Sequence, residues 1–403
     1  MSGPLKGIRV LDLTRILAGP WATQMLADFG AEVIKIEKPG EGDDTRGWGP
    51  PFIQNGDGSV GDAAYFQSAN RGKRSVCIDM ATAQGQILIQ KLAKQSDVVI
   101  ENFKVGGLKK YGLDHASLSK ADPRLIYCSI TGFGQSGPYA NRAGYDFMIQ
   151  GMAGVMSVTG EPDGQPMKMG VAFSDIFAGL HAVIGIQGAL LHREKTGLGQ
   201  HIDISLLDSQ VAVLANQALN YLVGGKVPQR LGNAHPNIVP YQTFESADGH
   251  IIIAVGNDRQ YAAFCGVIGA PHLAHDDRFK TNRSRVENRQ QLIPLLANLM
   301  KLKTTAAWVS ALEIATVPYG PINSIDQVFE NPQVLARGLQ LGLTRGDGVQ
   351  IPGIANPIGF SASPVAYDRP PPQLGGDTDE VLREILQIDG PALAALRSSG
   401  VIS

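Results

Sequence analysis

Asp175 is the residue of this chain whose type and position most directly suggest chemistry. It follows Ser174 and begins a long apolar segment, and Ile176 to Lys195 contains no proline. This pattern predicts a helix of about five turns. The aspartate could simply cap the helix N-terminus. Alternatively, the helix amides and dipole could keep it ionised in an apolar site, which is the state that a carboxylate nucleophile requires.

The same segment predicts close packing against neighbouring backbone, because small residues recur along it. Gly197 follows a basic last turn and is expected to end the helix. The small residues are Gly170, Ala178, Gly179, Ala182, Gly185, Gly188 and Ala189.

Composition favours a globular protein of two or three domains, since the chain has 403 residues and is 43% hydrophobic. The net charge of -2 gives no indication of nucleic acid or a membrane surface as a partner. The N-terminus resembles no signal or transit segment, and no uncharged apolar run is long enough to span a bilayer. We therefore expect a soluble, cytoplasmic protein. Cys77, Cys128 and Cys265 are isolated, which predicts buried reduced thiols, and the scattered histidines predict no metal site.

Strands and helices alternate over residues 1–150, which predicts an α/β fold with a parallel sheet wound on both faces. Ligands bind beyond the carboxyl ends of the strands of such sheets. This draws attention to Thr14–Ala18, Lys38 and Asn102–Lys104, each of which follows a predicted strand directly. The predicted strands are Ile8–Leu13, Val33–Glu37, Ser75–Asp79, Val98–Asn102 and Leu125–Thr131, with helices at Trp21–Phe29, Ala83–Gln95 and Gly107–Tyr111.

The second half of the chain predicts a smaller domain between two segments of the first. A Gly-rich polar stretch at Gly224–Pro236 marks a junction, and Pro240–Gly256 carries a hairpin signal. Val317–Ile325 is expected to return to the first domain as a strand, and Asp377 or Thr378 to cap a terminal helix. The remaining predicted elements are a strand at His201–Leu207 and helices at Asp208–Leu222, Tyr261–Ile268, Gln290–Met300 and Thr304–Ala315. The expected domains are residues 1–223, 224–326 and 327–403.

Gly132–Gly137 follows a predicted strand and matches the pattern G-x-G-x-x-G. A dinucleotide site also needs a helix to begin at this turn and an acidic residue about twenty positions later. Pro138 and a second loop follow instead, so no nicotinamide cofactor is expected. A nicotinamide-dependent dehydrogenase would rest on this match alone.

Several blocks together resemble the class III CoA-transferases, the CaiB/BaiF family. The similarity runs nearly end to end, and within the family it is greatest to succinyl-CoA:glutarate CoA-transferases, through RLGNAHPNIVPYQ (Arg230–Gln242) and GDDTR. The other blocks are LDLTRILAGPWATQMLADFGAEVIKIEKPGEGDDTRGWGPPF, NRGKRSVCIDM, VVIENF, GFGQSGP with RAGYD, GVAFSDIFAGLHAVIGIQGAL, KTGLGQHIDISLLDSQVA, VPYGPINSI and LGGDTDEVL.

The resemblance implies a large Rossmann-like domain that binds coenzyme A, a smaller α+β domain, and an interlocked homodimer. It implies CoA transfer from an acyl-CoA, such as succinyl-CoA, to a dicarboxylate, through an aspartyl anhydride and an aspartyl-CoA thioester. The family's nucleophile falls on Asp175, and a glycine loop over it falls near Gly256 and Asn257. The implied CoA-binding residues are Arg15, Leu17, Ala18, Lys38, Ile78, Ala81, Asn102, Phe103, Lys104, Lys110, Ala143, Tyr145 and Asp146, with Arg71 as a further candidate for the phosphates.

Three side chains are candidates for holding the acceptor acid. Arg46 and Arg142 lie in predicted loops and could bind a distal carboxylate through a bidentate contact. His235 also lies in a predicted loop, where it could equally be part of the domain junction.

Two alternatives share the resemblance. Racemases of the family act on 2-methylacyl-CoA with a histidine–aspartate pair, but Tyr145 stands at the histidine position, and a tyrosine is a poor base at neutral pH. The other alternative is a protein that binds CoA without catalysis.

Overall fold

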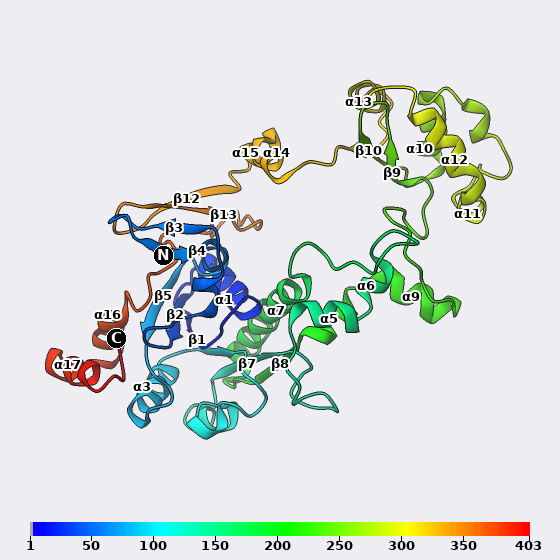
Figure 1. Ribbon diagram of the computed structural model, residues 1–403. Coiled ribbons are helices and arrows are strands. Elements are labelled where there is room, and N and C mark those ends of the chain that lie inside the picture. Colours follow the sequence, from blue (N-terminus) through cyan, green and yellow to red (C-terminus); the bar gives the residue numbers. More distant parts are fainter. Residues whose placement is uncertain (1–2) are drawn as a thin grey trace. The chain divides into compact units, whose positions relative to one another are not determined.

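The computed structural model describes residues 3–403, which fall into two compact units (Figure 1). Unit 1 comprises Met1–Ala153, Gly170–Val213 and Pro332–Ser403, and unit 2 comprises Gly154–Met169 and Leu214–Asn331. These bounds differ from the domains expected from the sequence, because two segments before residue 224 belong to unit 2. The helix expected over Asp208–Leu222 is in fact two helices, α8 (Leu206–Ala212) and α9 (Ala215–Gly224).

Unit 1 is built on a six-stranded parallel sheet with the order β5-β2-β1-β6-β7-β8 (Figure 1). The chain runs outward from β1 in one direction and then from β6 in the other, so the order reverses between these two strands. Ligands of doubly wound sheets bind at this point, beyond the carboxyl ends. The strands are β1 (Arg9–Asp12), β2 (Glu32–Glu37), β5 (Lys73–Cys77), β6 (Val98–Glu101), β7 (Ile126–Thr131) and β8 (His201–Ser205).

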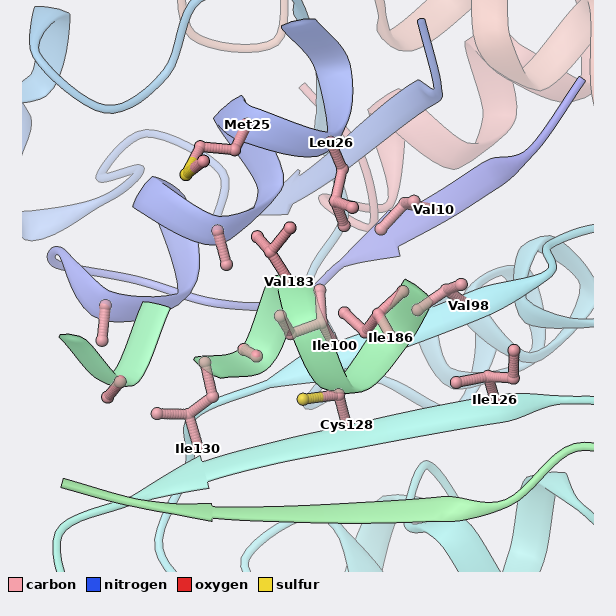
Figure 2. Close-up of a cluster of buried hydrophobic side chains, with 14 of the residues drawn as sticks. Val10, Met25, Leu26, Val98, Ile100, Ile126, Cys128, Ile130, Val183 and Ile186 are labelled. Carbon is pink, nitrogen blue, oxygen red and sulfur yellow. The ribbon is translucent and has the colours of Figure 1, made fainter. Parts of the chain in front are cut away.

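One face of this sheet is covered by α1 (Ala18–Asp28) and α7 (Phe173–Thr196). Figure 2 shows Met25 and Leu26 of α1 and Val183 and Ile186 of α7 beside apolar side chains of the strands. The predicted close packing of α7 is confirmed at Gly179, where a Cβ atom would lie only 2.7 Å from the carbonyl oxygen of Ala18. The helix is long and apolar enough to cross a membrane by composition, yet its buried residues belong to this core.

The other face is covered by α3 (Ala83–Lys94), α16 (Thr378–Leu386) and α17 (Gly390–Ser398). Asp377 occupies the N-cap position of α16, as predicted, but its side chain makes no capping hydrogen bond. The Asp377 carboxylate accepts a hydrogen bond from Ser75 N (2.9 Å), and Thr378 Oγ1 accepts one from Cys77 N (3.0 Å). Both side chains therefore bind α16 to the edge strand β5.

The sequence did not indicate several short elements of unit 1. Two antiparallel hairpins lie in stretches for which no element was predicted, because the glycine and polar residues in them mask the alternation of short exposed strands. These elements are η1 (Asp44–Gly47), β3 (Phe52–Gln54), β4 (Val60–Ala63), α2 (Ala64–Gln67), α4 (His115–Leu118), α5 (Asp146–Met152), α15 (Pro332–Ala336), β12 (Gln340–Thr344) and β13 (Gln350–Ile354). The short helix expected near Gly107 is η2 (Lys109–Tyr111).

Unit 2 contains a three-stranded sheet with the order β11-β10-β9 and its own apolar core. The expected hairpin is present, but the strand expected at Val317–Ile325 is only β11 (Tyr319–Gly320). Because β11 pairs with β10, its expected return to the first domain is wrong. The other elements are α6 (Val155–Val158), β9 (Tyr241–Glu245), β10 (His250–Ala254), α10 (Asp258–Val267), η3 (Pro271–Ala274), α11 (Asn282–Glu287), α12 (Arg289–Met300), α13 (Thr305–Ile314) and α14 (Ile325–Glu330). All three cysteines are buried and unpaired, as predicted.

Candidate active site

A cavity of about 670 Å³ lies in unit 1 at the carboxyl ends of β1, β6 and β7. The turn after β1, the loop after β6, the loop after β7 and the start of α7 all contribute to its wall. The sheet order predicts a ligand site at this edge, and the sequence had drawn attention to two of these loops. The cavity also includes Asp175, the candidate nucleophile.

Ten of the thirteen residues that the resemblance implied for CoA line this cavity. They are Arg15, Leu17, Ala18, Asn102, Phe103, Lys104, Lys110, Ala143, Tyr145 and Asp146. The other three lie elsewhere. Lys38 is exposed and forms an ion pair with Glu41, Ile78 is buried in the core beside Ile402, and Ala81 lies at the surface. Met80, from the same segment as Ile78 and Ala81, does line the cavity.

Asp175 is the third residue of α7, not its cap. Ala172 occupies the N-cap position, and no side chain of that residue caps the helix. The side chain of Asp175 is half-buried, and its pKa is raised to about 7 by burial and by the negative charge of Asp146. The alternative in which the helix start keeps Asp175 fully ionised at neutral pH is therefore wrong, because burial raises its pKa and disfavours the charged form.

Asp146 places the start of α7. Its Oδ1 accepts a hydrogen bond from Ser174 N at 2.8 Å, and its Oδ2 accepts one from Gln150 Nε2 at 2.8 Å. Ser174 Oγ in turn donates to Gln210 Oε1 of α8 at 2.9 Å. The candidate nucleophile is thus positioned by Asp146 of α5, about thirty residues before it, and by Gln210 of α8, about thirty-five residues after it. A local sequence motif cannot reveal contacts over such separations.

Tyr65 is a further residue near this carboxyl pair that the sequence analysis missed. Burial raises the pKa of Tyr65, and the negative charges of Asp175 and Asp146 raise it further. The phenol therefore lies close enough to interact electrostatically with both carboxylates. Its ring packs edge-on against Trp48, with 5.3 Å between the ring centroids. No local pattern marks Tyr65, because it lies in the short helix α2 within a stretch for which no element was predicted.

Three of the cations that line the cavity lie against aromatic rings. The Arg15 guanidinium lies 5.8 Å from the ring of Phe103, and Lys110 Nζ lies 4.6 Å from the ring of Tyr111. Arg142 stacks on Tyr139 at 4.6 Å and is exposed, as are Arg15, Lys104 and Lys110. Such cations can bind phosphate groups without first losing a partner inside the protein core.

Arg46 does not reach the cavity, so the hypothesis that it binds the acceptor acid is wrong. Its guanidinium is buried, donates to both oxygens of Glu37 (2.9 and 2.7 Å) and to Asp62 (2.7 Å), and stacks 3.7 Å from the ring of Phe66. Arg71 is likewise committed to a bidentate pair with Asp28, at 2.8 and 2.6 Å, so its expected contact with CoA phosphates is also wrong. Arg142, in contrast, lines the cavity.

The three other substrate candidates belong to unit 2, where each makes local hydrogen bonds. His235 Nδ1 accepts from Asn237 N at 3.0 Å, and Gly256 N donates to Gln260 Oε1 at 2.8 Å. Asn257 caps α10 through the amide of Gln260. Their contact with substrate stays a prediction.

The glycine motif after β7 does not form a dinucleotide-binding turn. Gly134 N donates to Thr131 Oγ1, and the next helix, α5, begins only at Asp146. Gly132 instead allows a close crossing of two loops, since a Cβ atom there would lie 2.6 Å from the Cα of Gly144. This geometry removes the one observation that favoured a dehydrogenase. Within residues 3–403, no group of three or more His, Cys, Asp or Glu could hold a metal ion.

Comparison with known proteins identifies the family of the chain. Residues 5–378 match the model of CoA-transferase family III. A succinate–glutarate CoA-transferase of Agrobacterium fabrum is 54% identical over 96% of this chain and 97% of its own length. Succinyl-CoA:glutarate CoA-transferase of Mus musculus is 44% identical over 99% of this chain and 90% of its own length.

A CaiB/BaiF family protein from Brucella suis has a solved structure that superimposes with a TM-score of 0.85. It is 52% identical, and the match covers 96% of this chain and 100% of that one. The chain therefore belongs to CoA-transferase family III and is an enzyme of that class.

Proposed function

We propose that the enzyme transfers CoA from succinyl-CoA to glutarate, with Asp175 as the nucleophile. The observation that carries this proposal is the position of Asp175 in the cavity at the reversal of strand order, where α/β sheets bind ligands. The succinate–glutarate activity of the relatives from Agrobacterium fabrum and Mus musculus supports the choice of acids.

The volume and the charged lining of the cavity support acyl-CoA as its ligand. A cavity of about 670 Å³ lies within the usual range of roughly 300–1,000 Å³ for small-molecule sites. Arg15, Lys104 and Lys110 offer exposed cations for the phosphates, and the thioester would reach Asp175. We infer that the parallel sheet with its two covered faces serves as a Rossmann-like CoA-binding domain.

The reaction divides into two acyl-transfer halves. The Asp175 carboxylate attacks the thioester carbonyl, the carbon–sulfur bond breaks, and a mixed anhydride and CoA thiolate form. The thiolate then attacks the Asp175 carbonyl carbon, which releases succinate and leaves an aspartyl-CoA thioester. Glutarate attacks this thioester, and the freed thiolate finally attacks the glutaryl carbonyl, which restores the Asp175 carboxylate. No water or free CoA is consumed, so the thioester energy is conserved.

The pKa of Asp175, about 7, suits this chemistry. At neutral pH about half of the carboxyl groups are ionised, and a carboxylate with a raised pKa is more basic than an ordinary one. The burial that raises the pKa of Asp175 therefore also makes its carboxylate a more reactive nucleophile. Displacement of water by acyl-CoA would raise both the pKa and the reactivity further.

We further infer that two copies of the chain associate as an interlocked dimer. Large apolar side chains are exposed on α5, α7 and α8, and exposed apolar patches of this kind mark interaction surfaces. They include Phe147, Met148, Met152, Ile184, Leu191 and Val211. Light scattering at low micromolar concentration should give twice the mass of the chain, 42.9 kDa. A monomer that retains full activity would contradict this inference.

The transfer proposal is tested by incubating the enzyme with succinyl-CoA and a panel of acids and identifying new acyl-CoA by mass spectrometry. Glutaryl-CoA should dominate, and Asp175→Ala should form none. Asp208→Ala is the matched control, since this exposed aspartate lies in the first turn of α8. Hydroxylamine added during turnover should label the peptide that contains Asp175. An active Asp175→Ala enzyme would refute the nucleophile, and deuterium exchange at the α carbon of 2-methylacyl-CoA would favour racemisation.

A further inference from the structure

The turn between β1 and α1 holds an unfavourable backbone conformation at the wall of the cavity. Arg15, Ile16, Leu17 and Ala18 all line the cavity. Ile16 has a φ angle of 72°, a region that L-residues rarely adopt and that is a clear outlier for a β-branched side chain. Such a conformation persists only where the surrounding structure imposes it.

A buried ion pair beneath the turn imposes it. Lys35 of β2 and Asp43 have fully buried side chains, and Lys35 Nζ lies 2.9 Å from Asp43 Oδ2. Lys35 Nζ also donates to the carbonyl oxygen of Thr14 at 2.8 Å, and Asp43 Oδ1 accepts from Ile16 N at 3.2 Å. The pair therefore binds the backbone at the strained residue and two residues before it.

Both partners are themselves fixed. The register of the sheet places Lys35 beside Asp12, and Asp43 N donates to Glu37 Oε1 at 2.9 Å. Asp43 Oδ1 also accepts hydrogen bonds from the amide (3.0 Å) and the hydroxyl (2.8 Å) of Thr45. The facing lysine lowers the pKa of Asp43 to about 2 against the opposing effect of burial, so the carboxylate stays charged at neutral pH.

The other side of the turn is held by the loop after β6. Arg15 N donates to Asn102 Oδ1 at 3.0 Å, and Asn102 Nδ2 donates to the carbonyl oxygen of Arg15 at 2.7 Å. Asn102 lines the cavity and can contact a ligand, whereas Lys35 and Asp43 lie outside its lining. The buried pair therefore has no direct contact with the cavity. It acts on the cavity through the turn, by the backbone of Thr14 and Ile16 and by Asp44, which follows Asp43 and forms an ion pair with Arg15 at 2.9 Å.

We propose that Lys35 and Asp43 are positioning residues for acyl-CoA, which hold the turn Thr14–Ala18 in the strained conformation that shapes the CoA cavity. This inference rests on the proposed binding of CoA in that cavity. Replacing a buried ion pair by apolar residues is often neutral or stabilising, so stability alone gives little reason for these charges at this position. The charges are explained if they fix a single conformation of the turn, since Lys35 donates a hydrogen bond to the turn backbone and Asp43 accepts one from it.

The test compares Lys35→Met and Asp43→Asn with the native enzyme. Isothermal titration with CoA gives Kd, and initial rates give KM for succinyl-CoA and for glutarate, together with kcat. Both variants should raise Kd for CoA and KM for succinyl-CoA by about tenfold, while kcat and KM for glutarate change by less than about threefold. Asp43→Asn keeps the shape of the side chain and serves if Lys35→Met does not fold.

Arg71→Met is the matched control, because it breaks another buried ion pair of unit 1, with Asp28, at a place outside the cavity lining. Its thermal stability should fall, but its Kd for CoA should stay within about twofold of the native value. Arg193→Met, which removes an ion pair with Asp97 at the end of α7, serves the same purpose if Arg71→Met does not fold.

Ile16→Gly separates positioning from a general structural role. Glycine adopts positive φ without a steric penalty, so the turn can keep its conformation without the hydrogen bonds with Lys35 and Asp43. Lys35→Met should therefore weaken CoA binding by less than about threefold when introduced into Ile16→Gly, compared with about tenfold in the native background. Equal losses in both backgrounds, or an unchanged Kd in Lys35→Met, would overturn the inference.

Lys110→Ala distinguishes this outcome from a failure of the CoA site itself. If Lys110→Ala weakens CoA binding and the Lys35 and Asp43 variants do not, the positioning role is refuted and the cavity assignment stands. If Lys110→Ala and Asn102→Ala both leave Kd unchanged, the cavity assignment fails and the positioning role fails with it.

Discussion

Replacing Asp175 by asparagine should make the protein more stable at alkaline pH while it abolishes transfer. The pKa of Asp175 rises from 3.8 to about 7 on folding, because burial and Asp146 disfavour its charge. Between these two values the folded protein holds a proton that the unfolded chain has released. The free energy of unfolding therefore falls as the pH rises through this window, and the loss is complete above about pH 7.

The structure sets the size of the effect. A shift of about three pKa units corresponds to about 4 kcal/mol at about 1.4 kcal/mol per unit, which is the upper limit for the gain at pH 8.5. At pH 5.5 only about half of this penalty has developed, so the gain should be about 2 kcal/mol smaller. Asparagine carries no charge at either pH, and its amide cannot replace the carboxylate as nucleophile.

The assay is urea or thermal unfolding of the native enzyme and of Asp175→Asn at pH 5.5 and pH 8.5, followed by a probe in unit 1. Asp208→Asn, at an exposed aspartate in the first turn of α8, controls for the exchange of a carboxylate for an amide. The stability gain of Asp175→Asn over the native enzyme must grow from pH 5.5 to pH 8.5. A gain that is equal at both pH values, or a loss at pH 8.5, would refute the argument that the folded site penalises the Asp175 charge.

Three further predictions follow from the same contacts. Asp146→Asn removes the charge that helps to raise the pKa of Asp175, so the acid limb of the pH profile of kcat/KM should move to lower pH; an unmoved limb would contradict this coupling. Arg46→Met leaves the carboxylates of Glu37 and Asp62 without their guanidinium partner and should lower the free energy of unfolding by roughly 3–5 kcal/mol, with an unchanged KM for glutarate; a raised KM without loss of stability would restore Arg46 as a substrate contact. Lys110→Ala should raise KM for succinyl-CoA, and this difference from the native enzyme should shrink as salt is increased, because an exposed cation acts on phosphate through screened charge; a difference independent of salt would exclude that role.

Much of the parallel sheet could be predicted because its signals are local. Buried strands such as β2 and β6 are short apolar runs between polar turns, and α7 is a long apolar segment without proline. The carboxyl ends of these strands point to the ligand-binding edge as soon as the sheet is recognised as parallel. The turn Thr14–Ala18 and the loop after β6 were therefore identified before any side chain was placed.

Other predictions failed where the partner of a residue is distant in sequence. Arg71 finds Asp28 across 43 positions, and both carboxylate oxygens of Asp28 are engaged. Arg46 donates to Glu37, which precedes it in the sequence, and to Asp62, which follows it. The residues next to Arg46 in the sequence do not distinguish it from Arg142, which is exposed at the cavity. A loop arginine is equally compatible with an ion pair and with a substrate contact until its neighbours are in place.

The sequence by itself determined the elements, the class of sheet, the family resemblance and the residue that could act as nucleophile, since these depend on residue types and their local spacing. Only the tertiary structure decided which cations are exposed at the cavity, which aspartate accepts a hydrogen bond from the first turn of α7 and how readily Asp175 gives up its proton. Those properties arise from burial and from charges contributed by separate segments, such as Asp146 beside Ser174 and Asp43 beneath Ile16. Electrostatic energies depend on distance in space and on exclusion of water, and both are set only when the chain has folded.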